Sequence, residues 1–108
     1  IEVIGNEIKL AEIKLDPAQA PFGHVRYGHG NCGGADEGAV TGNVIYTSCL
    51  GPVLVRNPAL AMELLRRGAG AAGIETSPEQ FRLKSADILH EQACLEEAKH
   101  FIGKKMEK

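Results

Sequence analysis

Cysteine and histidine are the side chains of this sequence with the widest chemical scope, because they act as nucleophiles, bases and metal ligands. A nucleophilic cysteine works best on a sharp turn between a strand and a helix, next to a histidine base. Residues 42–60 have this outline, since the uncharged run Val44–Tyr46 is followed by a Gly51-Pro52 turn and by Pro58. We expect a buried strand that leads through the turn into a capped helix.

The positions of the cysteines do not fit a nucleophile on such a turn. Cys32 falls in a loop, Cys49 inside the strand and Cys94 inside an expected helix. Their odd number and irregular spacing argue against a disulfide framework and favour a reducing, cytoplasmic compartment. Cys49 is interpreted as a small buried hydrophobic residue, with a reactive thiol as the alternative.

Two pairs of side chains have the spacing of metal ligands. His29-x-x-Cys32 is the tighter pair, and Cys49 could join it through space. No second tight pair follows in the sequence, as a zinc site would require. His90 and Cys94 lie four residues apart on one helical face, where core packing is the preferred interpretation. We therefore expect no metal site.

A glycine-rich loop spans residues 28–42, with Asp36 and Glu37 inside it. So much glycine indicates positive φ angles or close approach of the backbone to another group. Phosphate binding is disfavoured, because the loop joins strand to strand and no Gly-Lys-Ser/Thr follows. The two acidic side chains are interpreted as solvated, or as available to a partner. We expect no cofactor.

The N-terminal half is expected to form strands. Residues 1–15 alternate between apolar and polar with one slip of phase, which fits a bulged strand or two strands joined at Gly5-Asn6. An amphipathic helix over residues 7–15 is the alternative. Two prolines make residues 16–21 a connector, and residues 23–27 form another short strand.

The C-terminal half is expected to form helices. The first covers residues 58–67, and Asn57 is expected to accept hydrogen bonds from the free amides of its first turn. Residues 68–73 then close this helix and form a flexible linker. A second helical pattern starts at Ser77 and runs to about Ile102, with a break near residues 85–87.

Composition fits one small α/β domain that covers residues 1–108. The chain has no tryptophan and few other aromatic residues, so the core must be aliphatic. A net charge of −2 gives no attraction to nucleic acid, and no segment is apolar enough to span a membrane. We expect neither nucleic acid nor a membrane as partner.

Two groups of motifs carry a resemblance to a known family. The first pairs Tyr27-Gly28-His29-Gly30-Asn31 with Glu37-Gly38-Ala39, and the second pairs Tyr46-Thr47-Ser48-Cys49-Leu50-Gly51-Pro52 with Asn57-Pro58-Ala59-Leu60-Ala61. Together they resemble the C-terminal part of class I glutamine amidotransferase domains of the cobyric acid synthase type. The glutaminase subunit of lipid II isoglutaminyl synthase is the most similar member. The pattern from Leu83 to Phe101 is similar to the last helix of that family.

The resemblance implies part of a doubly wound α/β sheet with C-terminal helices, of which this chain supplies the C-terminal half. The family keeps its catalytic histidine at the position of Leu50, and its cysteine elbow lies upstream of the matched segment. No catalytic residue is therefore intact here, although Cys49 is adjacent to the histidine position. Residues expected around the former pocket are Tyr27, Gly30, Asn31, Cys49, Leu50 and Gly51.

The implied function is a degenerate or partial glutamine amidotransferase-like domain that does not hydrolyse glutamine alone. In the family, ammonia passes to an ATP-dependent ligase that amidates a carboxylate on a cell-wall precursor or a corrinoid. The expected partners are a second copy or a complementary chain, and such a ligase. A non-catalytic ligand-binding or assembly module on the same scaffold is the alternative, and an unrelated small α/β binding protein is a third.

Overall fold

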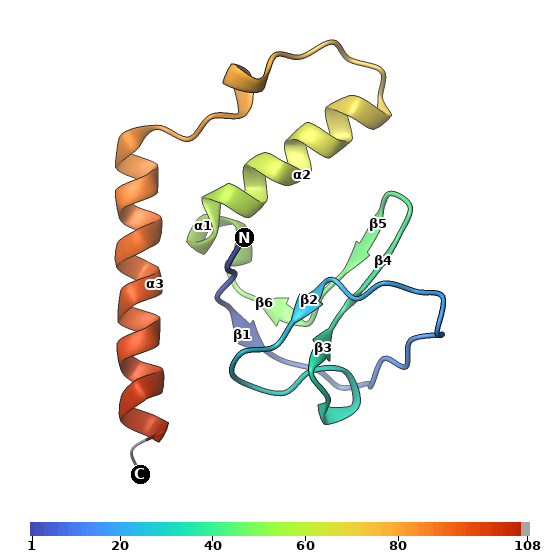
Figure 1. The fold of residues 1–108 in the computed structure, drawn as a ribbon, viewed down its shortest axis with the longest axis vertical. Coiled ribbons are helices and arrows are strands. Elements are labelled where there is room, and N and C mark those ends of the chain that lie inside the picture. Colours follow the sequence, from blue (N-terminus) through green and yellow to red (C-terminus); the bar gives the residue numbers. More distant parts are fainter. Residues whose placement is uncertain (107–108) are drawn as a thin grey trace. The chain divides into compact units, whose positions relative to one another are not determined.

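The computed structural model describes residues 1–106, which divide into two compact units. One unit is Gly5–Gly51, and the other joins Ile1–Ile4 to the chain from Pro52 onward. Figure 1 shows strands in the first of these units and helices in the second. The expected mixed α/β class is confirmed.

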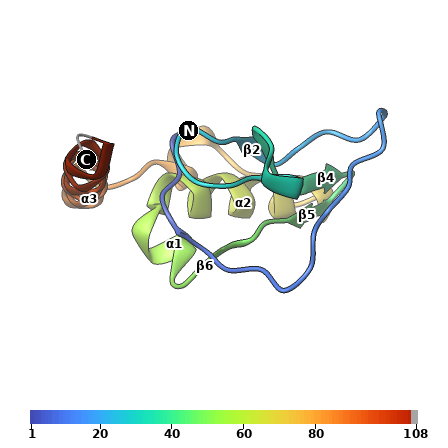
Figure 2. The same cartoon turned by 90° about the horizontal axis from the view of Figure 1, so that it is seen from below.

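Three antiparallel two-stranded sheets build the unit Gly5–Gly51 (Figures 1 and 2). They pair β1 with β6, β2 with β3, and β4 with β5. The strands are β1 (Asn6–Glu7), β2 (Gly23–His24), β3 (Asp36–Glu37), β4 (Ala39–Thr41), β5 (Val44–Tyr46) and β6 (Cys49–Leu50), and a 3₁₀ turn covers Asn31–Gly33. Within residues 1–106 every strand pairing is antiparallel, so no parallel doubly wound sheet is present there.

The first fifteen residues form less strand than expected. Asn6 pairs with Leu50 and Glu7 with Cys49, and the pairing ends there because β6 has only these two residues. The alternative of a helix over residues 7–15 is also wrong. The side chain of Leu10 is fully exposed, so the apolar alternation of this segment does not mark a core-facing strand.

The hairpin of β4 and β5 corrects the expected buried strand. Thr41 pairs with Val44 across a two-residue turn, in which Gly42 adopts a φ of 56°. Val44 is 71% exposed and Tyr46 is 42% exposed. The run is uncharged, but only β4 pairs with β5 and neither strand face is fully covered.

Helices α1 (Val53–Arg56), α2 (Pro58–Ala71) and α3 (Ser85–Met106) build the other unit. Helix α2 is longer than expected, because it continues through Gly68 to Ala71. Gly73, at a φ of 71°, ends it, and Ile74 N–H donates to Ala69 O at 3.0 Å.

The second helical pattern has the expected break, but it lies at residues 82–84 and not at residues 85–87. The 3₁₀ helix η2 (Pro78–Phe81) follows Ser77, whose N–H donates to Gln80 Oε1 at 2.8 Å. The chain then leaves the helical conformation, and α3 starts at Ser85. No helix within the described range is both long enough and apolar enough to cross a membrane.

Asn57 does not cap α2 as expected. Its Oδ1 accepts from Ile4 N–H at 2.8 Å, and its Nδ2 donates to Ile4 O and to Val53 O, each at 2.7 Å. The side-chain amide thus pairs with both backbone groups of Ile4, as a neighbouring strand would. Asn57 is 1% exposed, and Leu60 is buried close by in the sequence on α2. Through these bonds, Asn57 attaches the N-terminal segment Ile1–Ile4 to the helices.

Candidate functional site

Close backbone contacts fix the glycine-rich loop. Gly30 N–H donates to Gly34 O at 3.1 Å, and Gly33 N–H donates back to Gly30 O at 3.0 Å. A Cβ atom on Gly30 would lie 2.2 Å from Asp36 O and 2.5 Å from Gly34 O. Because no side chain fits there, Gly30 allows the loop to close on itself.

Asn31 fastens this loop to the start of the β4–β5 hairpin. Its Nδ2 donates to Gly38 O at 2.9 Å, and its Oδ1 accepts from Gly38 N–H at 3.0 Å. Gly38 has a φ of 67°, and a Cβ atom there would lie 2.1 Å from Tyr46 O. Both the conformation and the space at this position therefore demand glycine.

Glu37 lies at the centre of the site and is not solvated as expected. It is 7% exposed, and its carboxylate accepts from Ser48 N–H at 2.8 Å and from Thr47 Oγ1 at 2.6 Å. Thr47 Oγ1 in turn accepts from Cys49 N–H at 3.0 Å. Asp36 behaves differently, because its exposed carboxylate lies 2.8 Å from His24 Nδ1. Of the acidic pair, Glu37 is thus a structural group.

Charged side chains from residues 7–12 surround the loop. Lys9 Nζ donates to Gly30 O and lies 3.0 Å from Glu7 Oε1. Glu7 Oε2 accepts from His29 N–H at 2.9 Å, and Glu12 Oε2 accepts from Cys32 N–H at 2.7 Å. Sequence reasoning missed these residues, although their charges interrupt the apolar alternation and were a usable signal.

Glu7 and Lys9 shift each other's pKa values. Partial burial opposes the charge on Glu7, but the hydrogen bonds from Lys9 and from His29 N–H outweigh it, so the pKa of Glu7 is lowered. The hydrogen bond to Glu7 raises the pKa of Lys9. Both groups are charged at neutral pH, and they hold the loop backbone from outside.

The loop borders an open depression of about 240 Å³. Its lining residues are Ile13, Lys14, Leu15, Asn31, Cys32, Gly34, Ala35 and Asp36. Of the expected pocket residues, Asn31 lines it and Gly30 is buried, whereas Tyr27 and Gly51 are exposed. A depression this open does not enclose a substrate.

Cys49 and Leu50 are not poised for catalysis. Burial raises the pKa of the Cys49 thiol, the hydrogen bond with Thr47 partly opposes this, and the charges of Glu37 and Glu7 raise it further. Cys49 is therefore a protonated, half-buried thiol at neutral pH. Leu50 is 45% exposed and supplies no base.

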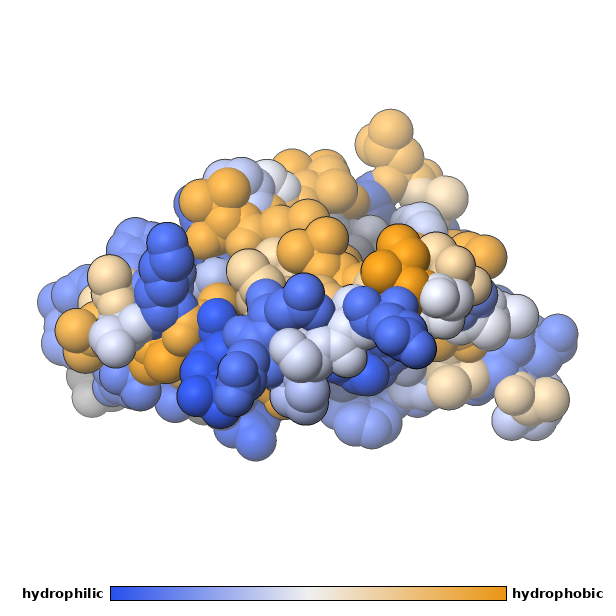
Figure 3. Space-filling model, turned by 90° about the horizontal axis from the view of Figure 1, so that it is seen from above, coloured by the Kyte–Doolittle hydropathy of each residue, from blue (hydrophilic) through white to orange (hydrophobic). Residues whose placement is uncertain are grey.

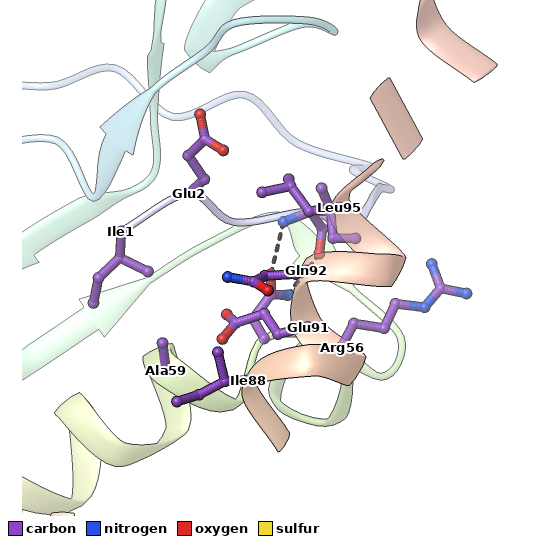
Figure 4. Close-up of a pocket in the computed structure, with 10 residues that line it drawn as sticks. Ile1, Glu2, Arg56, Ala59, Ile88, Glu91, Gln92 and Leu95 are labelled. Carbon is purple, nitrogen blue, oxygen red and sulfur yellow. Dashed lines mark hydrogen bonds between the residues drawn. The ribbon is translucent and has the colours of Figure 1, made fainter. Parts of the chain in front are cut away.

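A second depression, of about 260 Å³, lies in the helical unit (Figure 4). Helix α3 contributes Ile88, Glu91, Gln92 and Leu95, and the other lining residues are Ile1, Glu2, Ile4, Arg56, Asn57 and Ala59. Lys99 Nζ reaches Glu2 Oε2 at 3.3 Å. Sequence reasoning missed this depression, because it depends on Asn57 holding the N-terminal segment against the helices.

The fold and these contacts define a mixed α/β protein whose glycine-rich loop is held by a buried glutamate and an asparagine clamp. Comparison with protein-family models, with curated proteins and with solved structures found no match. Across the described part of the chain, no three His, Cys, Asp or Glu side chains cluster as metal ligands.

Proposed function

We propose that this chain is a degenerate or partial glutamine amidotransferase-like domain that acts with a partner and does not hydrolyse glutamine alone. One observation carries the proposal. The two stretches that resemble the family are joined through the resembling residues themselves, since Glu37 of the first accepts from Thr47 and Ser48 of the second. A chance likeness of two separate stretches would not require such contacts.

The requirements at individual positions support the same proposal. Gly30 and Gly38 stand where a Cβ atom would meet backbone oxygen atoms at 2.2 Å and 2.1 Å. Asn31 holds both backbone groups of Gly38. The residues that match the family motifs are thus those on which the shape of this unit depends.

The proposal includes a larger sheet than the described strands form. Strand β5 pairs with β4 along one edge only, and an unpaired edge is a site for a further strand. Under the proposal, the short antiparallel pairs are one part of a doubly wound sheet that a complementary chain completes. Figure 3 shows hydrophobic side chains (orange) on the molecular surface. Exposed examples include Ile8, Leu10, Val44, Leu54, Val55 and Leu65.

The completed unit would serve an ATP-dependent ligase in a reducing, cytoplasmic setting. The ligase would amidate a carboxylate, on a cell-wall precursor or a corrinoid, with ammonia from glutamine. The three cysteines are free thiols, which is compatible with such a compartment. This chain would supply the scaffold around the site, and the nucleophile would come from the partner.

A non-catalytic binding or assembly module is the second candidate function. Leu50 at the base position and the raised pKa of Cys49 favour it, because neither residue can take part in the family's reaction. Under this alternative the loop would still be held by Glu37 and Asn31, but no nucleophile would be supplied by another chain.

Native mass spectrometry of the protein purified from the cells that make it separates these two functions. A stoichiometric second polypeptide with a Gly-x-Cys-x-Gly elbow is the expected result. A homo-oligomer or a monomer without such a chain would contradict the amidotransferase proposal and leave the assembly module.

If the second polypeptide is found, a complex can be reconstituted from it and this chain. Substitution L50H in that complex tests whether Leu50 occupies the position of the base. A correctly placed general base contributes roughly 10²–10⁴-fold to a rate, so glutamine hydrolysis should rise at least by about 10²-fold. The control L50Q is polar and of similar size but cannot act as the base, and it should give no gain. Equal rates for the two variants in an intact complex would show that Leu50 does not occupy the histidine position.

A further inference from the structure

A pair of metal-ligating side chains lies on α3, away from the glycine-rich loop. His90 Nε2 and Cys94 Sγ are 3.6 Å apart, one helical turn from each other. The expected core packing is wrong for His90, which is exposed, while Cys94 is half-buried. Neither the proposed function nor the packing of the helical unit uses this pair.

The separation of the two atoms matches a tetrahedral zinc ion. Zinc bonds are about 2.3 Å long to a thiolate and about 2.0–2.1 Å long to an imidazole nitrogen. At the tetrahedral angle, these lengths put the sulfur and the nitrogen about 3.6 Å apart. The distance between the two atoms therefore suits the binding of one metal ion by both side chains.

One chain supplies only half of the required ligands. A tetrahedral zinc site takes four, and within residues 1–106 no third His, Cys, Asp or Glu joins this pair. The other ligands must come from outside the described part of the chain.

The two sides of α3 differ in their surroundings. Ile88 and Leu95 face the depression next to the N-terminal segment. At about 100° per residue, they lie about 140–160° around the helix from His90. His90 is thus on the exposed side of α3, whereas Cys94, about 40° away and half-buried, lies at the edge of the side that its own unit covers.

Phe101 extends this outer side. It lies seven residues beyond Cys94, on the same helical face, and it is 59% exposed. Leu89 is 66% exposed but lies about 140° around the helix from Cys94. Phe101 is thus an exposed apolar side chain on the same face as the ligand pair.

We propose that His90 and Cys94 form half of a zinc site, which the same pair of a second copy completes as Cys₂His₂. Two-fold symmetry places identical surfaces against each other, so two half-sites give the four ligands that the metal requires. On binding, each Cys94 thiol releases its proton to solvent and the thiolate sulfur bonds to the metal, together with the neutral His90 imidazole. This inference is independent of the proposed glutamine chemistry.

Metal titration of the reduced, EDTA-treated full chain tests the proposal. Zn²⁺ should bind at one ion per two chains and double the mass measured by native mass spectrometry. Co²⁺ should give the visible absorption of a tetrahedral site and a thiolate charge-transfer band. Variants C94S and H90Q should each lose both effects.

The matched control is C32S, because Cys32 is an exposed thiol outside the helical unit. It should retain both effects. Binding that survives in C94S and H90Q, or that is lost in C32S, would overturn the site. One metal ion per chain without a doubled mass would overturn the completion by a second copy. If circular dichroism shows lost helix in C94S, the exposed H90Q variant decides the outcome.

Discussion

Cys49 and Cys32 are thiols of the same unit in opposite environments. Cys32 is exposed, whereas burial and the nearby carboxylates raise the pKa of Cys49. Since the thiolate is the reactive form, iodoacetamide at neutral pH should modify Cys49 more slowly than Cys32, by about an order of magnitude or more. Peptide mass spectrometry over time measures the two rates. In urea, where the protein is unfolded, the two rates should be equal. Equal rates in the folded protein as well would contradict the protonated state of Cys49.

Glu37 shows how one buried carboxylate can join two segments. The variant E37Q keeps the shape of the side chain but replaces an ionised double acceptor with a neutral amide. The bond with Thr47 Oγ1 must then reverse its direction, because the amide nitrogen donates, and both bonds lose the charge of their acceptor. We expect the free energy of unfolding to fall by about 2 kcal/mol, as for hydrogen bonds to charged groups.

Asp36 provides the matched control for that substitution. Its carboxylate is 49% exposed and contacts His24, which is itself 81% exposed. The variant D36N should change the free energy of unfolding by less than about 1 kcal/mol, because exposed pairs contribute little. Urea unfolding at neutral pH measures both variants. Equal effects would mean that Glu37 does not join the segments.

At the scale of elements, two glycines distinguish the cost of a left-handed backbone conformation from the cost of a steric clash. Gly33 and Gly38 have similar φ angles of 72° and 67°. A Cβ atom on Gly33 meets nothing within 4 Å, but one on Gly38 would lie 2.1 Å from Tyr46 O. G33A should cost roughly 1–2 kcal/mol from the left-handed conformation alone. G38A should cost clearly more, because the β4–β5 hairpin must also move.

Urea unfolding of the two alanine variants provides that comparison, and chemical shifts of Tyr46 report on the hairpin. They should change in G38A and stay constant in G33A. Similar stabilities for both variants would mean that the loop relaxes without using the space that Gly38 leaves.

Helix α2 carries a cluster of charges that predicts a dependence on pH. Hydrogen bonds from Arg66 and Arg67 lower the pKa of Glu63 from 4.5 to about 2. A lowered pKa in the folded state stabilises the protein above the unfolded value and loses this effect as the pH falls through the folded value. The contribution of Glu63 is therefore complete above about pH 4.5 and disappears near pH 2.

The variant E63Q checks this direction. The difference in urea midpoint between the wild type and E63Q should be constant above pH 5 and shrink towards pH 2. High salt should also reduce it, since the three side chains are partly exposed and their attraction is screened. A carboxyl titration by NMR with an unshifted midpoint would contradict the proposed contacts.

The whole molecule has little apolar interior. Among the described residues, Leu60 is the one large apolar side chain that is buried. Large apolar side chains such as Ile1, Leu10 and Val55 are well exposed. Asn57, Glu37 and Ser48 are buried instead, and hydrogen bonds hold them. Such an interior gives marginal stability on its own.

Association would therefore stabilise the fold by mass action. If the chain associates with itself, as an assembly module would, the urea midpoint should rise when the protein concentration is raised 100-fold with EDTA present. For a dimer, the expected gain is about 2.7 kcal/mol. Sedimentation velocity on the same samples identifies the species. An unchanged midpoint with a monomeric species would exclude self-association as the source of stability.

Several boundaries of helices and strands could be predicted from the sequence. Pro58 marked the start of α2, and the break before Ser85 was expected from the residues around it. Gly42 marked the boundary of the run that forms β5, although its hairpin with β4 was not expected. These features depend on residues within one or two turns of each other, so propensity and capping rules were sufficient. Gly68 misled the same rules, because a glycine can continue a helix as well as end it.

Contacts between distant residues were decided only by the tertiary structure. Asn57 bonds to Ile4 across 53 positions of the chain, and Glu37 bonds to Ser48 across 11. From the sequence alone, Asn57 is predicted to be a helix cap and Glu37 to be a solvated charge, because their distant partners are not known before the chain is folded. The sequence alone therefore determined the kinds of elements. The tertiary structure determined which polar side chains are buried, how short the strands are, and which face of α3 carries His90 and Cys94.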